Sequence, residues 1–168
     1  GTMIELPRAA LMAGEIALVD ERACALMEKF WPGPLTLVLP KREGIPDAVT
    51  AALPTVAVRR PDHPVAMALI EGAGPIAAPS ANRSTRLSPT RAQDVDPALG
   101  DFLVLDGGPC RVGIESTIVD LSDPEGPRLL RLGRIGKDEL EQVLGVTVLR
   151  RKEGAPIVAP GGYAKHYA

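Results

Sequence analysis

Aromatic residues, basic charge and the usual metal-binding side chains are all scarce in this chain. Only 3% of its 168 residues are aromatic, which disfavours an RNA-binding surface built on base stacking. The formal net charge is −2, so no excess of basic residues attracts nucleic acid. The two cysteines, Cys24 and Cys110, lie in no Cys-x-x-Cys or Cys/His spacing. We therefore expect neither a structural zinc nor a disulfide framework, and a reducing cytoplasmic environment.

Several sequence motifs are also missing. The longest apolar runs are too short to cross a bilayer, so no membrane association is expected. The N-terminus lacks the basic and apolar regions of a signal peptide, and Gly1 and Thr2 before Met3 are typical of an expression scar. The chain has no Gly-x-Ser-x-Gly, Gly-x-Gly-x-x-Gly or P-loop motif. With two histidines and no acidic cluster, we expect no protein-held catalytic metal.

Short strands and helices, separated by many of the 17 glycines and 17 prolines, fill most of the chain. Apolar spacing and turn residues predict helices at 7–13, 21–30, 64–71 and 137–144, a helical turn at 47–52 and a helix capped by Ser88 or Thr90. They predict strands at 15–19, 35–39, 55–60, 76–78, 102–106, 117–121, 128–132 and 146–149. This mixture indicates an α/β fold, a mixed, twisted open sheet with helices packed on it. We expect one domain over residues 1–149 and a linker over 150–168.

The stretch 75–90 is the most informative part of the chain. A short apolar strand at 76–78 is followed by small hydroxyl and amide side chains, including Ser80, Asn82 and Thr90. Loops of this composition lie against ligands at the carboxyl ends of buried strands in open α/β sheets. A solvated surface loop with a helix cap at its end is the alternative.

Small polar or basic residues also lie at the ends of other predicted strands, at the first or the last residues. Arg59 and Arg60 end one strand, Ser116 opens another, and Arg131 lies near the end of a third. Arginine makes two-point, permanently charged contacts, and small side chains let backbone N–H groups approach an anion. The pattern favours a site for phosphate and carboxylate groups. For any single arginine, a surface ion pair remains the alternative.

Several motifs resemble those of the threonylcarbamoyl-AMP synthase family, whose catalytic domain has the YrdC-like fold. They are Lys-Phe-Trp-Pro-Gly-Pro-Leu-Thr-Leu-Val-Leu at 29–39, Thr-Val-Ala-Val-Arg at 55–59, Pro-Ser-Ala-Asn at 79–82, Ser-Pro-Thr at 88–90, Gly-Ile-Glu-Ser-Thr-Ile at 113–118 and Leu-Arg-Leu-Gly at 130–133. The tail, with Ala-Pro-Gly at 159–161 and His-Tyr-Ala at 166–168, resembles the linker of the two-domain members. The motifs occur in the family order from about residue 20 to the end.

The resemblance implies an activity and a set of ligand contacts. The family makes threonylcarbamoyl-AMP and pyrophosphate from L-threonine, bicarbonate and ATP, and ATP brings its own Mg²⁺. The product goes to a tRNA threonylcarbamoyl-transferase complex that forms t6A37, whereas direct tRNA binding by this chain has little support. By resemblance, threonine or its carbamate contacts Arg59, Ser80 and Ser116. By resemblance, ATP contacts Thr55, Asn82, Thr90, Arg131 and His166 or Tyr167.

The sequence departs from the family near its N-terminus. Family members carry Pro-Thr-x-Thr-x-Tyr-Gly-Leu after the first strand and later a Lys-x-Arg-Pro, which supply part of the threonine pocket and the main cationic clamp on the phosphates. Neither motif occurs here, and the chain passes from the opening helix and strand to the helix before Trp31 at a seam near 18–19. A real deletion and a segment lost from the sequence both explain this. A real deletion predicts weak or absent synthase activity.

Two other functions stay open. One is a non-catalytic nucleotide- or RNA-binding module of the same fold, which the missing cationic motif favours. The other is a related carbamoyl-transfer domain that handles carbamoyl phosphate. The linker-like tail favours the synthase over the second alternative.

Overall fold

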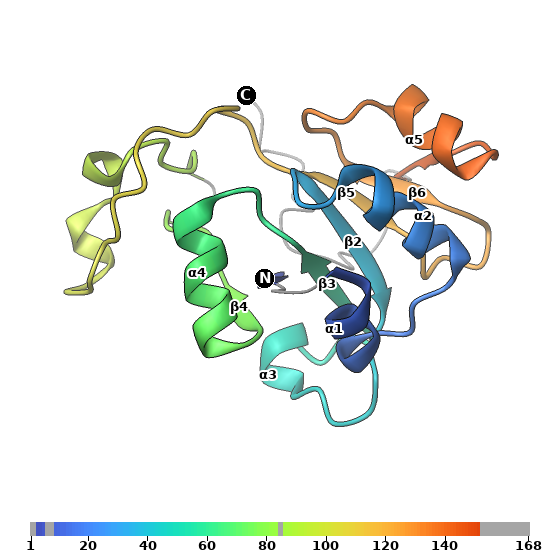
Figure 1. Cartoon of the computed structure of the whole chain (residues 1–168), viewed down its shortest axis with the longest axis horizontal. Helices are drawn as coiled ribbons and strands as arrows, with labels where there is room; N and C mark the ends of the chain where they lie inside the picture. Colours follow the sequence, from blue (N-terminus) through green and yellow to red (C-terminus); the bar gives the residue numbers. More distant parts are fainter. Residues whose placement is uncertain (1–2, 6–8, 84–85, 152–168) are drawn as a thin grey trace.

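One mixed β-sheet forms the centre of the molecule in the computed structural model, which describes residues 3–5, 9–83 and 86–151 (Figure 1). Within these residues the strand order is β4-β1-β3-β2-β5-β6-β7. The strands are β1 (Met3–Glu5), β2 (Leu35–Pro40), β3 (Thr55–Arg59), β4 (Ile76–Ala78), β5 (Thr117–Asp120), β6 (Arg128–Arg131) and β7 (Leu149–Arg150). Three neighbouring pairs are parallel (β1–β3, β2–β5, β6–β7) and three are antiparallel (β1–β4, β2–β3, β5–β6). The predicted mixed α/β sheet is confirmed.

Helices are joined to this sheet by short connections. The helices are α1 (Ala9–Ile16), α2 (Glu21–Phe30), α3 (Asp47–Thr50), α4 (Pro64–Ala73) and α5 (Lys137–Leu144), with 3-10 turns at Ala92–Asp94 and Pro97–Leu99. α2 begins as its sequence predicts, because the Asp20 carboxylate accepts a hydrogen bond from Ala23 N at 2.9 Å. In the described part of the chain, no helix is long and apolar enough to span a bilayer.

Alternation along the central strands separates two faces of the sheet. Leu35, Leu37 and Leu39 of β2, with Val56 and Val58 of β3, face a large core. The same core contains residues of α1, α2 and α5, and Figure 1 shows α1 and α2 lying over β2 and β3. Val38, Ala57 and Ile118 form a separate, smaller cluster, because successive side chains of a strand point to opposite faces. The second face therefore carries little apolar area and leaves room for polar groups.

A turn rich in proline and glycine fixes the end of α2 against the sheet. Trp31 Nε1 donates to Leu35 O at 2.7 Å, and Gly33 N donates to Arg60 O at 2.9 Å. A Cβ on Gly33 would lie 2.4 Å from Phe30 O, so no larger residue fits without moving the backbone. The turn thus holds the carboxyl end of β3 next to the start of β2.

Two of the predicted strands are wrong. Residues 15–19 do not form a strand: α1 continues through Ile16, and Ala17 forms only an isolated bridge with Lys41. Ala13, Ile16 and Ala17 are buried at helical spacing, so packing outweighs the helix-ending preference of Gly14. Residues 102–106 are irregular, and Leu103 is 87% exposed. Strand-forming residues need a neighbouring strand, and none in the described chain pairs with this segment.

Three other predictions are changed by the structure or lie outside it. The helix expected after Ser88 or Thr90 is reduced to the two 3-10 turns. The last strand lies at Leu149–Arg150 rather than 146–149. The predicted linker, 150–168, lies almost wholly outside the described residues.

Replacing Glu141 by glutamine is expected to lower stability at neutral pH but not in acid. Lys137 Nζ at 2.7 Å and Val148 N at 2.8 Å both donate to Glu141 Oε1, and these bonds hold the pKa of this carboxyl below its usual 4.5. A lowered pKa in the folded state stabilises the protein above pH 4.5, and this stabilisation is lost as the pH falls through the lowered value.

Thermal unfolding followed by circular dichroism at a series of pH values measures the effect. The difference in Tm between wild type and Glu141→Gln should be largest at pH 7 and should shrink in acid. Glu21→Gln, on the exposed side of α2, is the matched control. A difference that does not change with pH would contradict this account.

Candidate functional site

Polar side chains form a row across the second face of the sheet. Arg59 lies two residues beyond Ala57 on β3, and Thr36 lies two residues before Val38 on β2, so both share the face of the small apolar cluster. Glu5 of β1 pairs with Arg59, and Arg131 of β6 pairs with Ile118 of β5. Directly paired residues project from the same face. The row therefore runs from β1 to β6 opposite the face that α1, α2 and α5 cover.

Ser116 and Arg131 form the buried centre of this row. Arg131 Nε donates to Ser116 O at 2.9 Å and Nη2 donates to Ser116 Oγ at 2.8 Å. Ser116 Oγ also shares a hydrogen bond of 2.8 Å with Thr36 Oγ1. Ser116 is 3% exposed and Arg131 8%. A guanidinium is thus held in a fixed orientation by a hydroxyl and a carbonyl, an arrangement suited to an anionic ligand.

Glu115 connects this centre to the loop of residues 75–90. Its Oε2 lies 3.3 Å from Arg131 Nη2, and its Oε1 accepts a hydrogen bond of 2.5 Å from Ser88 Oγ. Ser88 Oγ also lies within hydrogen-bond distance of Asn82 Oδ1, at 3.2 Å. The two sequence segments predicted to meet at a ligand, the 75–90 loop and the β5–β6 pair, therefore do meet.

Arg59 is held by a carboxylate at the other end of the row. Arg59 Nη2 lies 2.6 Å from Glu5 Oε1, and Arg59 Nε donates to Glu5 Oε2 at 3.3 Å. Burial raises the pKa of Glu5 above its usual 4.5, and the charge and hydrogen bond of Arg59 offset part of this effect. The Glu5 carboxyl group thus covers one edge of the Arg59 guanidinium.

The remaining predicted residues are more scattered. Thr55 is buried on the same face as Arg59, but four residues earlier on β3, which is about 13 Å at the usual rise of a strand. Ser80 and Thr90 are exposed, and Thr90 O accepts a hydrogen bond from Cys110 N at 2.8 Å. His166 and Tyr167 lie outside the described residues. The structure therefore brings Ser116, Arg131 and Asn82 into one network and leaves Arg59 beside it in the row.

Three polar members of the site were not predicted from the sequence. Thr36 interrupts an apolar strand, and that interruption is the signal that could have identified it. Glu115 directly precedes the predicted Ser116. Glu5 lies on β1, a strand that the sequence pattern did not indicate. Its position could not be inferred, because only pairing with β3 places it next to Arg59.

Gly133 packs directly on the backbone that carries Ser116. A Cβ on Gly133 would lie 2.4 Å from Glu115 O, 2.5 Å from Thr117 N and 2.7 Å from Ser116 C. Thr117 Oγ1 accepts hydrogen bonds of 3.1 Å from both Gly133 N and Ile135 N. The Leu-Arg-Leu-Gly motif thus presses Arg131 and the residues after it against the Glu-Ser-Thr segment.

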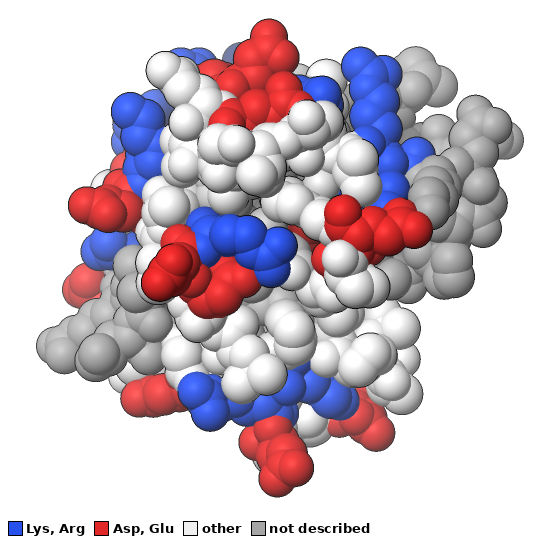
Figure 2. All heavy atoms as spheres, turned by 90° about the vertical axis from the view of Figure 1, so that its right-hand side faces the viewer, with Lys and Arg blue, Asp and Glu red and all other residues white. Residues whose placement is uncertain are grey.

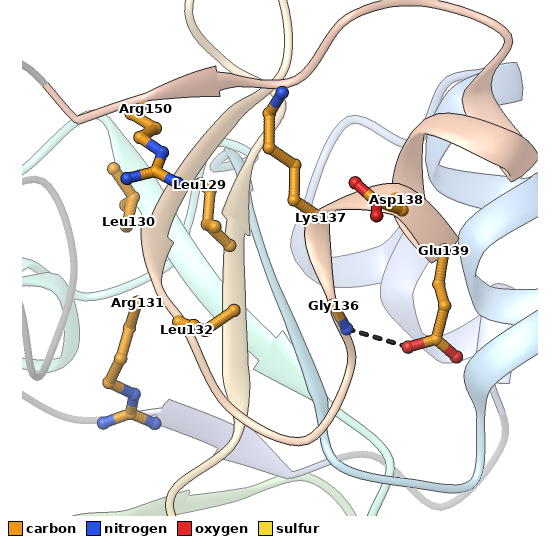
Figure 3. Close-up of a pocket in the computed structure, with 9 residues that line it drawn as sticks. All are labelled: Leu129, Leu130, Arg131, Leu132, Gly136, Lys137, Asp138, Glu139 and Arg150. Carbon is orange, nitrogen blue, oxygen red and sulfur yellow. Dashed lines mark hydrogen bonds between the residues drawn. The ribbon is translucent and has the colours of Figure 1, made fainter.

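Two hollows border the site. One, of about 530 Å³, lies between β6 and the start of α5, and Figure 3 shows the Arg131 guanidinium pointing away from α5. The other, of about 350 Å³, lies by the 75–90 loop. Its lining residues are Ala81, Asn82, Arg83, Arg86, Leu87, Pro89, Asp94 and Asp96. Because the Arg131 guanidinium turns from the first hollow toward Ser116, its charge belongs to the polar row.

Charge on the described surface is mixed. Figure 2 shows basic and acidic side chains side by side on the face that it presents. Arg128 contacts Asp123 and Glu125 at 2.7 Å each, and Lys137 contacts Glu141 at 2.7 Å. Among residues 3–5, 9–83 and 86–151, no group of three or more His, Cys, Asp or Glu side chains could hold a metal ion.

Comparison with known proteins agrees with this geometry. The Sua5/YciO/YrdC family model, described as "Telomere recombination", matches residues 6–133, which include Thr36, Arg59, Ser116 and Arg131 of the row but not Glu5. The chain belongs to the Sua5/YciO/YrdC family. This membership confirms the resemblance seen in the motifs and the α/β fold.

Individual relatives carry a more specific name. Threonylcarbamoyl-AMP synthases of Bacillus subtilis and Pyrococcus abyssi are each 45% identical, over 88% and 89% of this chain. A crystal structure of P. abyssi Sua5 complexed with L-threonine matches with a TM-score of 0.88 at 42% identity, over 99% of this chain. The matched regions are 44%, 46% and 51% of those proteins. The chain therefore spans about half the length of these relatives.

Replacing Gly133 by alanine is expected to destabilise the fold and to disturb Ser116. The added methyl would overlap backbone atoms that cannot rotate away, and overpacking of this kind costs about 1–3 kcal/mol. Urea unfolding measures the free energy of unfolding. Gly14→Ala in α1 is the matched control, because no atom lies within 4 Å of its added Cβ. That control should be neutral or stabilising. Equal stability of the two variants would contradict the packing described for Gly133.

Proposed function

We propose that this chain is the catalytic domain of a threonylcarbamoyl-AMP synthase. It would use L-threonine, bicarbonate and ATP, and would release pyrophosphate. The observation that carries this proposal is the buried Ser116–Arg131 pair, placed in one row with Arg59 and linked through Glu115 to the 75–90 loop. Two relatives at 45% identity bear the synthase name, and one solved relative binds L-threonine.

The proposed reaction needs few proton-transferring groups. The amine of threonine adds to bicarbonate and gives an N-carboxylate and water. An oxygen of this carbamate attacks the α-phosphorus of ATP, a new P–O bond forms, and pyrophosphate leaves with the electrons of the broken bond. Both reactants are anions, so charge neutralisation and alignment supply most of the rate enhancement. Arg59 and Arg131 are the charged groups of the row that suit this task.

The substrates would lie along the polar face. Threonine or its carbamate would contact Arg59, Ser80 and Ser116, and ATP would contact a longer set of residues. That set is Thr55, Asn82, Thr90, Arg131 and His166 or Tyr167. ATP and threonine lying end to end are long enough to span the distance of about 13 Å between Thr55 and Arg59 along β3. Mg²⁺ would arrive with ATP, since it keeps several waters and binds mainly to phosphates.

Two further expectations belong to the same proposal. Threonylcarbamoyl-AMP would pass to a tRNA threonylcarbamoyl-transferase complex in the cytoplasm. The free, exposed Cys24 and Cys110 suit a reducing compartment. The mixed charge of the surface in Figure 2 gives no support to direct tRNA binding there.

A second candidate function is nucleotide binding without catalysis. The sequence lacks the Lys-x-Arg-Pro motif that would face the phosphates. If this absence is a real deletion, residues 1–149 form a domain that lacks an internal segment near 18–19. Loss of the cations that hold the phosphates is expected to remove several kcal/mol of transition-state stabilisation, because removal of a single hydrogen-bond donor to a transition-state anion already costs about 3 kcal/mol. This loss would lower the rate more than it lowers ATP affinity.

Pyrophosphate release from ATP in the presence of L-threonine and bicarbonate separates the two functions. The synthase proposal predicts release that requires all three substrates, and the missing clamp predicts a slow rate. No release from a chain that still binds ATP would overturn the synthase proposal in favour of the binding module. Omitting threonine is the control for simple ATP hydrolysis.

Replacing Arg131 by alanine should weaken ATP binding by about 10- to 100-fold, because a hydrogen bond to a charged group contributes about 1.5–3 kcal/mol. Asn82→Ala should weaken it less, because a neutral amide makes weaker contacts. Isothermal titration calorimetry with ATP measures both. Arg134→Ala is the matched control, because Arg134 is an exposed arginine three residues further on. Unchanged affinity in Arg131→Ala would reject the site.

A further inference from the structure

We propose that Glu5 occupies the place on Arg59 that the carboxylate of the amino-acid substrate would take, so that Glu5 sets the affinity of this chain for L-threonine. The inference rests on the proposed function, which assigns Arg59 to threonine. The new point is that the Glu5 carboxylate competes with the threonine carboxylate for Arg59.

The geometry of the pair carries the proposal. Nε and one terminal nitrogen of an arginine form the edge that binds a carboxylate at two points. Glu5 fills that edge of Arg59, with Oε1 2.6 Å from Nη2 and Oε2 3.3 Å from Nε. A free amino acid that binds the same edge must displace the Glu5 carboxylate.

The exposed fractions of the two side chains show whether Glu5 competes with the substrate carboxylate or binds the substrate ammonium group. A carboxylate beside an arginine could also receive the ammonium group of an amino acid. The Glu5 side chain is only 9% exposed, whereas the Arg59 side chain is 27% exposed. A ligand arriving from solvent therefore meets the guanidinium before it meets the carboxylate. The proposed carbamate intermediate is also anionic at its former amine, so an ionised Glu5 would repel it.

The position of Glu5 makes displacement feasible. Its backbone is held in β1 between β3 and β4, opposite Arg59 on one side and Ile76 on the other. Only the side chain has to rotate for Arg59 to become available. Burial disfavours the charged form of Glu5 and raises its pKa, so the carboxylate sits in an unfavourable environment that Arg59 only partly offsets. The fold thus retains this carboxylate at a cost, and a substrate carboxylate can replace it.

Isothermal titration calorimetry with L-threonine on the 168-residue chain tests the proposal. Glu5→Gln keeps the shape of the side chain but removes its charge, and it should lower the Kd for threonine by about tenfold, which corresponds to about 1.4 kcal/mol. L-Threoninol, which lacks the carboxylate, should show no such gain. Glu125→Gln is the matched control, because Glu125 also contacts an arginine, Arg128 at 2.7 Å, but lies outside the row.

A second variant, Glu5→Asp, tests the proposal without removing the negative charge. Glu5→Asp keeps the charge but is one methylene shorter, so it cannot make the same two-point contact with Arg59. It should bind threonine more tightly than the wild type and less tightly than Glu5→Gln. Thermal unfolding of each variant establishes that it is folded before titration.

The possible outcomes separate the inference from the proposed function. Threonine affinity that is unchanged or weaker in both Glu5 variants would overturn the inference, and weaker affinity would mean that Glu5 receives the ammonium group. The proposed function still stands in that case if Arg59→Ala abolishes threonine binding. If Glu5→Gln binds acetate as tightly as it binds L-threonine, the masked carboxylate site stands and the threonine assignment fails. If Arg59→Ala binds threonine like the wild type, both fail.

Discussion

The arrangement of the site depends on a buried positive charge. Arg131 is 8% exposed, and a buried cation is tolerated only when fixed acceptors surround it. Ser116 supplies a carbonyl and a hydroxyl, and Glu115 supplies a carboxylate. These acceptors can reach the guanidinium only if β5 and β6 are adjacent and the segment after β6 turns back tightly, which the lack of a side chain at Gly133 permits.

The same requirement explains why the conspicuous motifs of the sequence have a structural role. Thr117 accepts the backbone N–H groups of Gly133 and Ile135 and donates to Ile135 O, so the Glu-Ser-Thr segment holds the turn that follows Arg131. The Trp-Pro-Gly-Pro turn plays a similar part at the other end of the site, where Gly33 holds the backbone of Arg60. These contacts fix where Arg59 and Arg131 lie relative to each other.

Sequence reasoning succeeded where local pattern and local structure coincide. The apolar stripe of α2, the apolar run of β2 and the polar ends of β3 and β5 could all be predicted, because each is encoded within a few residues. The strand expected at 15–19 failed because burial of Ala13, Ile16 and Ala17 favours a helix through Gly14. Glu5 was missed for a different reason. Its importance comes from its contact with Arg59, which lies 54 residues further along the chain, and a single sequence contains no record of that pairing.

The position of Thr36 between Leu35 and Leu37 has a consequence for how the chain finds its native pairing. The two leucines belong to the core under the helices, and the hydroxyl between them bonds to Ser116 on the opposite face. A slip of β2 by one residue would place the hydroxyl under the helices and two leucines on the polar face, so both faces would reject the wrong alignment. The Thr36 side chain, which belongs to the polar row, therefore also favours the correct strand register during folding.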